Sequence, residues 1–271
     1  MKSTIFTPQK NIQYTINTSD MEISRNIKRR MATVVLATLL VGPFAKAEAE
    51  HTALPNPQGW YVGIDGGMPF GFSTFSSFGH DKTRAGYSFG AFGGYRFNAV
   101  LSAEATARYA EATLSAQDCC TERGYWLGSD GKRYQAGILD KDCWEYGELK
   151  SRVKMRQYGA RLNVNVLGMF RQTVDSRWAA SVSPHVYAIG TKADIRRIEG
   201  GKAVKTGTDW HLGYGADLQI GYQAASFMQV SAYSGITWFT GKQVDGMPEH
   251  LHKNNFVWET GIRLGFSITR R

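Results

Sequence analysis

Apolar residues alternate one for one with small or polar residues along eight segments of the chain that follow Gly59. In the clearest segment, 210–222, Trp210, Leu212 and Tyr214 share one face, and glycines and polar residues share the other. A repeat of two residues predicts strands with one apolar and one polar face. The predicted strands lie within 60–70, 87–97, 101–109, 157–166, 178–188, 210–222, 228–238 and 256–268.

The length and number of these segments favour a membrane barrel. Soluble strands usually have about five or six residues. These segments cover about 9–13, close to the roughly 9–11 that a tilted strand needs to cross a bilayer. An even number of strands also lets an antiparallel sheet close with both chain ends on one side.

The links between the segments alternate between short and long. Short links are expected at 98–100, 168–176 and 223–226, and long links at 71–84, 112–152, 191–208 and 240–255. Outer-membrane barrels show this pattern, with short periplasmic turns and long external loops.

The composition of the polar face indicates which face of each strand points outward. A soluble lipocalin-like barrel has the same alternation, but its apolar face points inward. Here the polar face is mostly Gly, Ser, Gln, Asn and Thr, which suits the narrow interior of an eight-stranded barrel. Aromatic residues that suit the lipid headgroup region lie near the ends of the apolar face, at Trp60, Tyr109, Trp178, Trp210, Tyr222 and Trp238. We therefore expect an all-β, eight-stranded antiparallel transmembrane β-barrel.

Composition and charge argue against two other classes of protein. The mean hydropathy is −0.33, and the longest apolar run, 32–44, is too short for a membrane-spanning helix, which needs roughly 20 residues. The net charge is +9, but residues 1–49 hold seven Lys/Arg and three Asp/Glu, and no basic stripe follows. This mild bias does not indicate nucleic-acid binding.

The first 49 residues match a secretory signal peptide. A basic cluster at 25–30 precedes the apolar stretch 31–44, and 45–49 offers two small-x-small cleavage sites. The alternative is a short amphipathic helix. We divide the chain into a signal peptide, 1–49, and an outer-membrane barrel domain, 50–271, and expect export to the outer membrane of a Gram-negative cell.

Alternating glycine and aromatic runs, such as GWYVGI at 59–64 and GIRLGF at 261–266, give the chain a family resemblance. It resembles the OmpA/OmpX-type small outer-membrane β-barrel proteins over 59–269, by pattern rather than by a diagnostic motif. The resemblance implies insertion by the barrel-assembly machinery. Such families include adhesion and immune-evasion proteins, structural barrels and a few lipid-modifying enzymes. Unlike them, this chain ends on Arg271 rather than on an aromatic residue. With no appended soluble domain, a peptidoglycan-binding role is not expected.

Four acidic and four basic residues fall on the predicted inner face. They are Asp65, Arg96, Glu104, Arg108, Arg161, Asp217, Glu259 and Arg263. Because an unpaired buried charge is costly, we expect them to form ion pairs. We favour a lumen plugged by these pairs over an ion pathway, since an eight-stranded barrel leaves little room for a pore.

All three cysteines fall in the longest predicted loop, 112–152. Because exported proteins meet an oxidising compartment, we expect a disulfide from Cys119 or Cys120 to Cys143, with the third cysteine free or paired between molecules. The aromatic residues of this loop fit a contact surface and a self-packed cap equally well; they are Tyr125, Trp126, Tyr134, Trp144 and Tyr146.

The sequence gives little support for a catalytic role of any residue. Ser183 with His185, and His211 with Asp217, combine the side chains of a hydrolytic site, but no nucleophile motif accompanies them. Three cysteines without a neighbouring histidine do not form a zinc pattern. We expect no catalytic residue, cofactor or metal.

The basic segment with Arg196, Arg197, Lys202 and Lys205 suits the phosphates of lipopolysaccharide, and a solvated charge run is equally compatible. We therefore expect outer-membrane lipid and lipopolysaccharide as surroundings, and a host or cell-surface ligand at the external loops. The predicted role is a non-enzymatic barrel that anchors those loops for structural or adhesive contacts. The alternatives are a lipid-modifying enzyme and a small channel.

Overall fold

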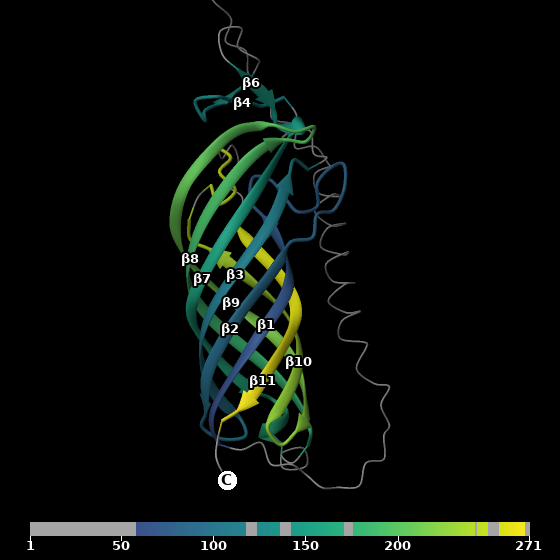
Figure 1. The fold of residues 1–271 in the computed structure, drawn as a ribbon, viewed down its shortest axis with the longest axis vertical. Helices are drawn as coiled ribbons and strands as arrows, with labels where there is room; N and C mark the ends of the chain where they lie inside the picture. Colours follow the sequence, from purple (N-terminus) through teal and green to yellow (C-terminus); the bar gives the residue numbers. More distant parts are fainter. Residues whose placement is uncertain are drawn as a thin grey trace, which may run out of the picture. The chain divides into compact units, whose positions relative to one another are not determined.

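The computed structural model describes residues 58–117, 124–135, 142–170, 176–241, 243–248 and 255–268. Eight antiparallel strands close into one barrel, in the order β1-β11-β10-β9-β8-β7-β3-β2 (Figure 1). Their bounds are Gly59–Phe72 (β1), Tyr87–Arg96 (β2), Leu101–Ser115 (β3), Leu149–Asn165 (β7), Trp178–Arg197 (β8), Lys202–Ala225 (β9), Met228–Phe239 (β10) and Phe256–Ser267 (β11). The predicted eight-stranded antiparallel barrel is confirmed.

The barrel closes between its first and last strands. β1 pairs with β2 on one side and with β11 on the other, and the second register runs from Tyr61 opposite Ser267 to Phe72 opposite Phe256. No sheet edge is left open within the barrel, so each strand finds backbone hydrogen-bond partners on both sides.

The apolar face points outward, as predicted. Trp60, Ile64 and Trp210 are 64%, 55% and 61% exposed, whereas Arg161 and Arg263, which have the opposite phase, are 3% and 2% exposed. A soluble barrel would show the reverse arrangement. The outer surface is therefore an apolar belt around a polar interior.

The strands extend beyond the predicted segments at the long-loop end. β8 has 20 residues and β9 has 24, so most of 191–208 is a hairpin and the prediction of a long link there is wrong. Gly200 and Gly201 form its turn with φ of +125° and +80°, values that only glycine adopts easily. The outer face of this extension carries polar residues such as Lys192 and Asp194, so an alternation of apolar and polar residues could not predict the strand there.

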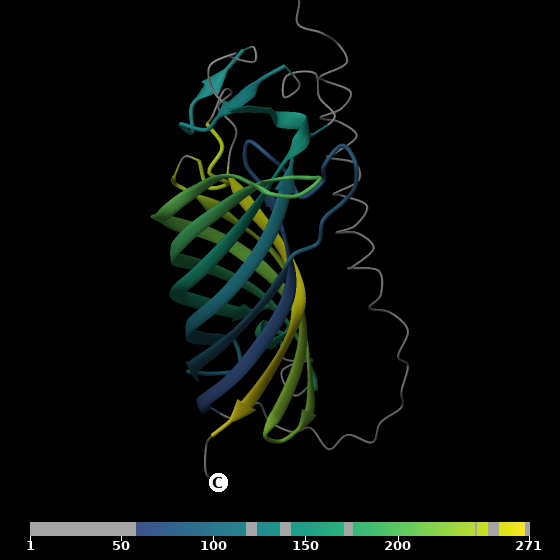
Figure 2. The same cartoon turned by 45° about the horizontal axis from the view of Figure 1, so that its top comes forward.

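A small sheet covers this end of the barrel. We call this sheet, together with the described residues of the links 73–86 and 243–248, the cap. The sheet consists of Trp126–Gly128 (β4), Arg133–Tyr134 (β5) and Cys143–Glu145 (β6), in the order β5-β4-β6 (Figure 2). Two 3-10 turns, Tyr146–Glu148 (η1) and Leu167–Met169 (η2), are the helical elements of the described residues. Within those residues, no helix has the length and apolar character to cross a membrane.

Candidate functional site

The middle of the lumen is filled by a charged cluster around Arg108. The Arg108 guanidinium donates to Asp65 at 2.9 Å, to Glu259 at 3.3 Å and to the Tyr233 hydroxyl at 2.9 Å. Ser88 also donates to Glu259, at 2.7 Å. All five residues are buried. Because each charge has an opposite charge and further hydrogen bonds, the cost of burying it is offset.

A second cluster centres on Arg263, which reaches across the barrel. Its guanidinium donates to Glu104 at 2.6 Å and to Gln219 at 3.0 Å, and lies 4.0 Å from Asp65. Tyr61 donates to the same Glu104 at 3.0 Å. Through Asp65 the two arginine clusters form one continuous network.

The third cluster joins Arg161, Asp217 and His185. Arg161 donates to Asp217, and His185 Nδ1 lies 3.5 Å from the same carboxylate. His185 Nε2 lies 2.9 Å from the Thr237 hydroxyl, and the imidazole stacks on Tyr187. The Asp217 carboxylate, the His185 imidazole and the Thr237 hydroxyl therefore lie side by side in space, enclosed within the lumen.

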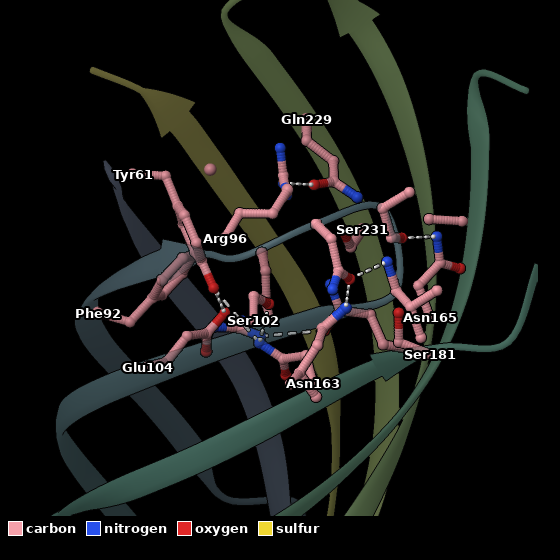
Figure 3. A pocket seen from close by; sticks show the side chains of 18 residues that line it. Tyr61, Phe92, Arg96, Ser102, Glu104, Asn163, Asn165, Ser181, Gln229 and Ser231 are labelled. Atoms are coloured by element: carbon pink, nitrogen blue, oxygen red, sulfur yellow. Dashed lines mark hydrogen bonds and ion pairs between the residues drawn. The ribbon is translucent and has the colours of Figure 1, made fainter. Parts of the chain in front are cut away.

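A polar recess of about 50 Å³ lies at the end formed by the short turns (Figure 3). The turn at 98–101 borders it, and Arg96 donates to Gln229 across it at 3.3 Å. The buried Oδ1 atoms of Asn163 and Asn165 have no hydrogen-bond partner within the described residues. Such a recess suits a few water-sized polar molecules.

Toward the long-loop end of the barrel, the side chains that point into the lumen are apolar. These buried residues are Ala110, Ala112, Leu114, Leu149, Val153, Met155, Tyr187, Ile189, Ala193, Ile195, Phe239 and Val257. Six residues from the links between the barrel strands complete the same cluster: Phe75, Ala116, Leu127, Tyr146, Val244 and Met247. The polar lumen is thus sealed by an apolar layer that strands and loops build together, which we call the outer plug.

Asp245 fixes two loops within the outer plug. Its two carboxylate oxygens accept the backbone N–H groups of Phe75 at 2.7 Å and Met247 at 3.1 Å. Its carbonyl accepts the Ser151 hydroxyl at 2.5 Å. Burial raises the pKa of the Asp245 carboxyl to about 6, although these hydrogen bonds oppose the shift. The link between β1 and β2 is thereby tied to the link between β10 and β11.

Three aromatic residues of the longest loop, Tyr125, Trp144 and Tyr146, pack into the cap. Tyr146 is fully buried and donates to the Pro248 carbonyl at 3.3 Å, and Tyr125 and Trp144 pack against the same cluster. Of the two roles weighed for these side chains, the structure supports a self-packed cap. Cys143 is half-buried in β6 and forms no disulfide with a residue that the structure describes. Cys119 and Cys120 lie outside the described residues, so the predicted disulfide stays a prediction.

The eight inner-face charges are all placed in the lumen, and the three clusters bring together Asp65, Glu104, Arg108, Arg161, Asp217, Glu259 and Arg263. Arg96 lies in the polar recess instead. Sequence reasoning did not assign Tyr61 and Tyr233 to the network, although both occupy the polar phase of their strands. An aromatic hydroxyl in that phase was the available signal.

Neither of the two side-chain combinations weighed for a hydrolytic site is hydrogen-bonded within the described residues. The buried Ser183 hydroxyl has no hydrogen-bond partner among the described residues, and His211 lies 2.9 Å from Thr191 rather than beside Asp217. Among the residues that the structure describes, no group of three His, Cys, Asp or Glu side chains is arranged to hold a metal ion.

Comparisons with known proteins describe the barrel and nothing more specific. No family model matches the chain, and no curated protein matches it. Neisserial surface protein A (NspA) is a similar solved structure, with 14% identity, a TM-score of 0.44 and coverage of 78% of this chain and 97% of that one. The attachment invasion locus protein Ail of Yersinia pestis, in complex with the heparin analogue sucrose octasulfate, has 10% identity, a TM-score of 0.39 and coverage of 78% and 100%.

The outer membrane protease OmpT from Escherichia coli is similar at 9% identity and a TM-score of 0.37, with coverage of 78% of this chain and 97% of that one. Likeness at this level carries no information about ligands or catalysis. The chain has the eight-stranded architecture implied by its resemblance to the OmpA/OmpX-type barrels.

Proposed function

We propose that this chain is a non-enzymatic outer-membrane barrel that conducts no ions and holds a folded cap of loops at the cell surface. The observation that carries the proposal is the double closure of the lumen, first by the charged clusters and then by the outer plug. An ion would have to displace paired charges and then cross an apolar layer without solvation.

The exposed belt supports placement in a membrane. Its large apolar side chains include Trp60, Ile64, Leu212 and Ile262, each more than half exposed. In water such a continuous apolar surface would drive aggregation, whereas in lipid it needs no cover. The tight hydrogen-bonded closure leaves no edge strand in contact with lipid.

The cap supports a role in surface contacts. Tyr125, Trp144 and Tyr146 are used for packing. Among the described residues of the cap, the polar residues Ser129, Asp130, Lys132 and Arg133 are exposed around the turn between β4 and β5. A binding surface there would be hydrophilic and would rest on the packed outer plug.

The test of the proposal is conductance after refolding. Residues 50–271 refolded in detergent should migrate differently before and after boiling, and should give no current steps in planar bilayers. Cells that display the chain should adhere to cultured animal cells, and replacing 129–133 with a Gly-Ser segment should abolish adhesion while the heat shift is retained. Stepwise current, or unchanged adhesion, contradicts the proposal.

One observation favours a second candidate, a lipid hydrolase: the run Asp217, His185, Thr237 resembles an acid–base–hydroxyl relay. All three lie in the lumen, and Asp217 is already bonded to Arg161. Hydrolysis of lipid A by the refolded protein, abolished by His185→Ala without loss of the heat shift, is the result that would favour the enzyme.

A further inference from the structure

A patch of basic residues lies on the outward face of β7 and β8, next to the aromatic rim of the belt. Its central members are Lys154, Arg156 and Lys192, whose side chains are all exposed. None of the three side chains makes an ion pair or hydrogen bond with a residue that the structure describes. We call these three residues the basic patch.

The strand register places the basic patch at the edge of the belt. Arg156 is directly opposite Tyr109 on β3 and Gly190 on β8, and Gly190 is opposite Trp210 on β9. Tyr158, two residues further along β7, stacks on Trp210. Aromatic rings of this kind mark the level of lipid headgroups, so the patch begins where the apolar belt ends.

Within the basic patch, like charges face each other across the sheet. Lys154 on β7 is directly opposite Lys192 on β8. Side chains at directly opposed positions lie close together, so two positive charges there repel and destabilise the strand pair. An anion placed between them would turn this repulsion into attraction.

The nearby carboxylates already have other partners. Glu111, which is opposite Lys154, is buried, accepts from Arg152 Nε and also accepts the hydroxyls of Tyr87 and Tyr109 at 3.3 and 3.4 Å. The basic patch therefore keeps its positive charge on that side.

Asp194 is the carboxylate on the β8 side, and Arg196 donates to its Oδ2 through Nε at 2.9 Å. Its Oδ1 has no partner among the described residues. The hydrogen bond from Arg196, together with the charges of Arg196, Lys202 and Lys154, holds the pKa of Asp194 below its usual value. One ionised carboxylate thus lies among several bases.

A second row of bases follows beyond Asp194. Lys150 is opposite Arg196, and Arg196 is opposite Lys202, on three successive strands. Counting side chains that the structure describes on this outward face, seven bases surround two acids: Lys150, Arg152, Lys154, Arg156, Lys192, Arg196 and Lys202 around Glu111 and Asp194. The face is strongly positive.

We propose that the basic patch binds the phosphate groups of a phosphorylated glycolipid of the surrounding outer leaflet. The proposal rests on the proposed function, because it requires the belt to lie in a bilayer. Ammonium and guanidinium groups form charge-assisted hydrogen bonds with phosphate, and the acyl chains of the lipid would lie on the belt below. The bound phosphate bridges Lys154 and Lys192 and relieves their repulsion.

The test uses the full barrel in phosphatidylcholine nanodiscs, with diphosphoryl lipid A or the same lipid without its phosphates as the probe. Lipid A with phosphates should raise the temperature at which the barrel unfolds, and the dephosphorylated lipid should not. The triple variant Lys154→Gln, Arg156→Gln, Lys192→Gln should bind diphosphoryl lipid A about 100-fold more weakly, from a factor of about five for each basic residue near an anionic surface.

A matched control removes three positive charges at other positions of the chain, by Lys82→Gln, Arg171→Gln and Arg177→Gln, and should bind nearly as the wild type does. Equal weakening in the two triple variants, or none in either, overturns the proposal. So does an equal stabilisation by inorganic phosphate, which would mean that the ligand is a free anion.

A single variant gives a second, sign-changing readout. In pure phosphatidylcholine, Lys192→Gln should unfold at a higher temperature than the wild type, because the repulsion from Lys154 is gone. With diphosphoryl lipid A the order should reverse, and a fixed order contradicts the proposal. Failure of the wild type to insert into pure phosphatidylcholine would instead refute the proposed function.

Discussion

At the scale of the residue, Asp245 shows how a single carboxyl can control the cap. It is fully buried, and its partners among the described residues are backbone N–H groups and hydroxyls rather than a cation. Without a positive partner the charged form is poorly compensated, and this is why its pKa rises to about 6 from the ordinary value of 3.8.

The raised pKa predicts a cap that loosens as the pH rises. The closed cap holds a proton that the open form releases, so the stabilisation is fully present below about pH 4 and is lost as the pH passes about 6. Hydrogen exchange of the Phe75 amide should therefore be slower at pH 4.5 than at pH 7.5, after correction for intrinsic rates. Asp245→Asn should flatten this dependence, and an unchanged dependence in the variant would contradict it.

At the scale of the element, inner-face glycines set how closely the strands and their side chains approach. A methyl group on Gly215 would collide with the backbone carbonyl of Ile236 and lie 2.8 Å from His185 Nε2. Gly93 faces outward, and a methyl group there meets nothing closer than Val62 Cγ1 at 3.8 Å.

This contrast predicts opposite tolerance at two glycines. Gly215→Ala should lower the unfolding temperature of the refolded barrel, because backbone atoms must shift to admit the methyl group. Gly93→Ala should change it little. Unboiled and boiled samples compared on gels over a temperature series would measure both, and equal behaviour would refute the packing argument.

The alternation of apolar and polar residues predicted well which segments are strands, which face of each points outward and in what order they pair. It did so because one face of each strand lies on the apolar outer surface and the other lines the polar lumen. It predicted the ends of the strands poorly where the strands continue beyond the apolar belt. Beyond Gly190, the outer face of β8 carries Lys192 and Asp194, so the apolar half of the pattern disappears although the hydrogen-bonded ladder with β9 continues. Lys154 and Lys192 meet only through that ladder, so the sequence alone could not join them in one patch.

At the scale of the whole molecule, one barrel separates three environments: lipid outside, paired charges in the middle and an apolar plug at the long-loop end. The inner-face charges were visible in the sequence, but their partners were not, since Arg263 and Glu104 are far apart in the chain. The outer plug was also not visible, because Phe75 and Met247 lie in segments that read as loops.

The placement of the belt predicts the effect of a charge on it. Ile64 is 55% exposed and lies between Trp60 and Phe70 along β1. Ile64→Lys should destabilise the barrel in vesicles by about 2–4 kcal/mol, the cost of a lysine near the bilayer midplane. Ser129→Lys, in the exposed cap, should have no such effect. Urea titration of vesicle-inserted protein measures the difference, and equal stability would place the belt outside the membrane.

The position of Asp245 in the chain has a consequence for the lifetime of the closed barrel. Phe75 lies three residues after the first strand, and Asp245 and Met247 lie in the link before the last, so the hydrogen bonds of Asp245 lie beside the junction where β1 meets β11. The bond from the Phe75 N–H joins the segments beside the two ends of the sheet, whereas the bond from the Met247 N–H lies within one link. Separation of β1 from β11 that starts at this end must break the bond between Phe75 and Asp245 early, so we expect Asp245 to slow the opening of the closed barrel.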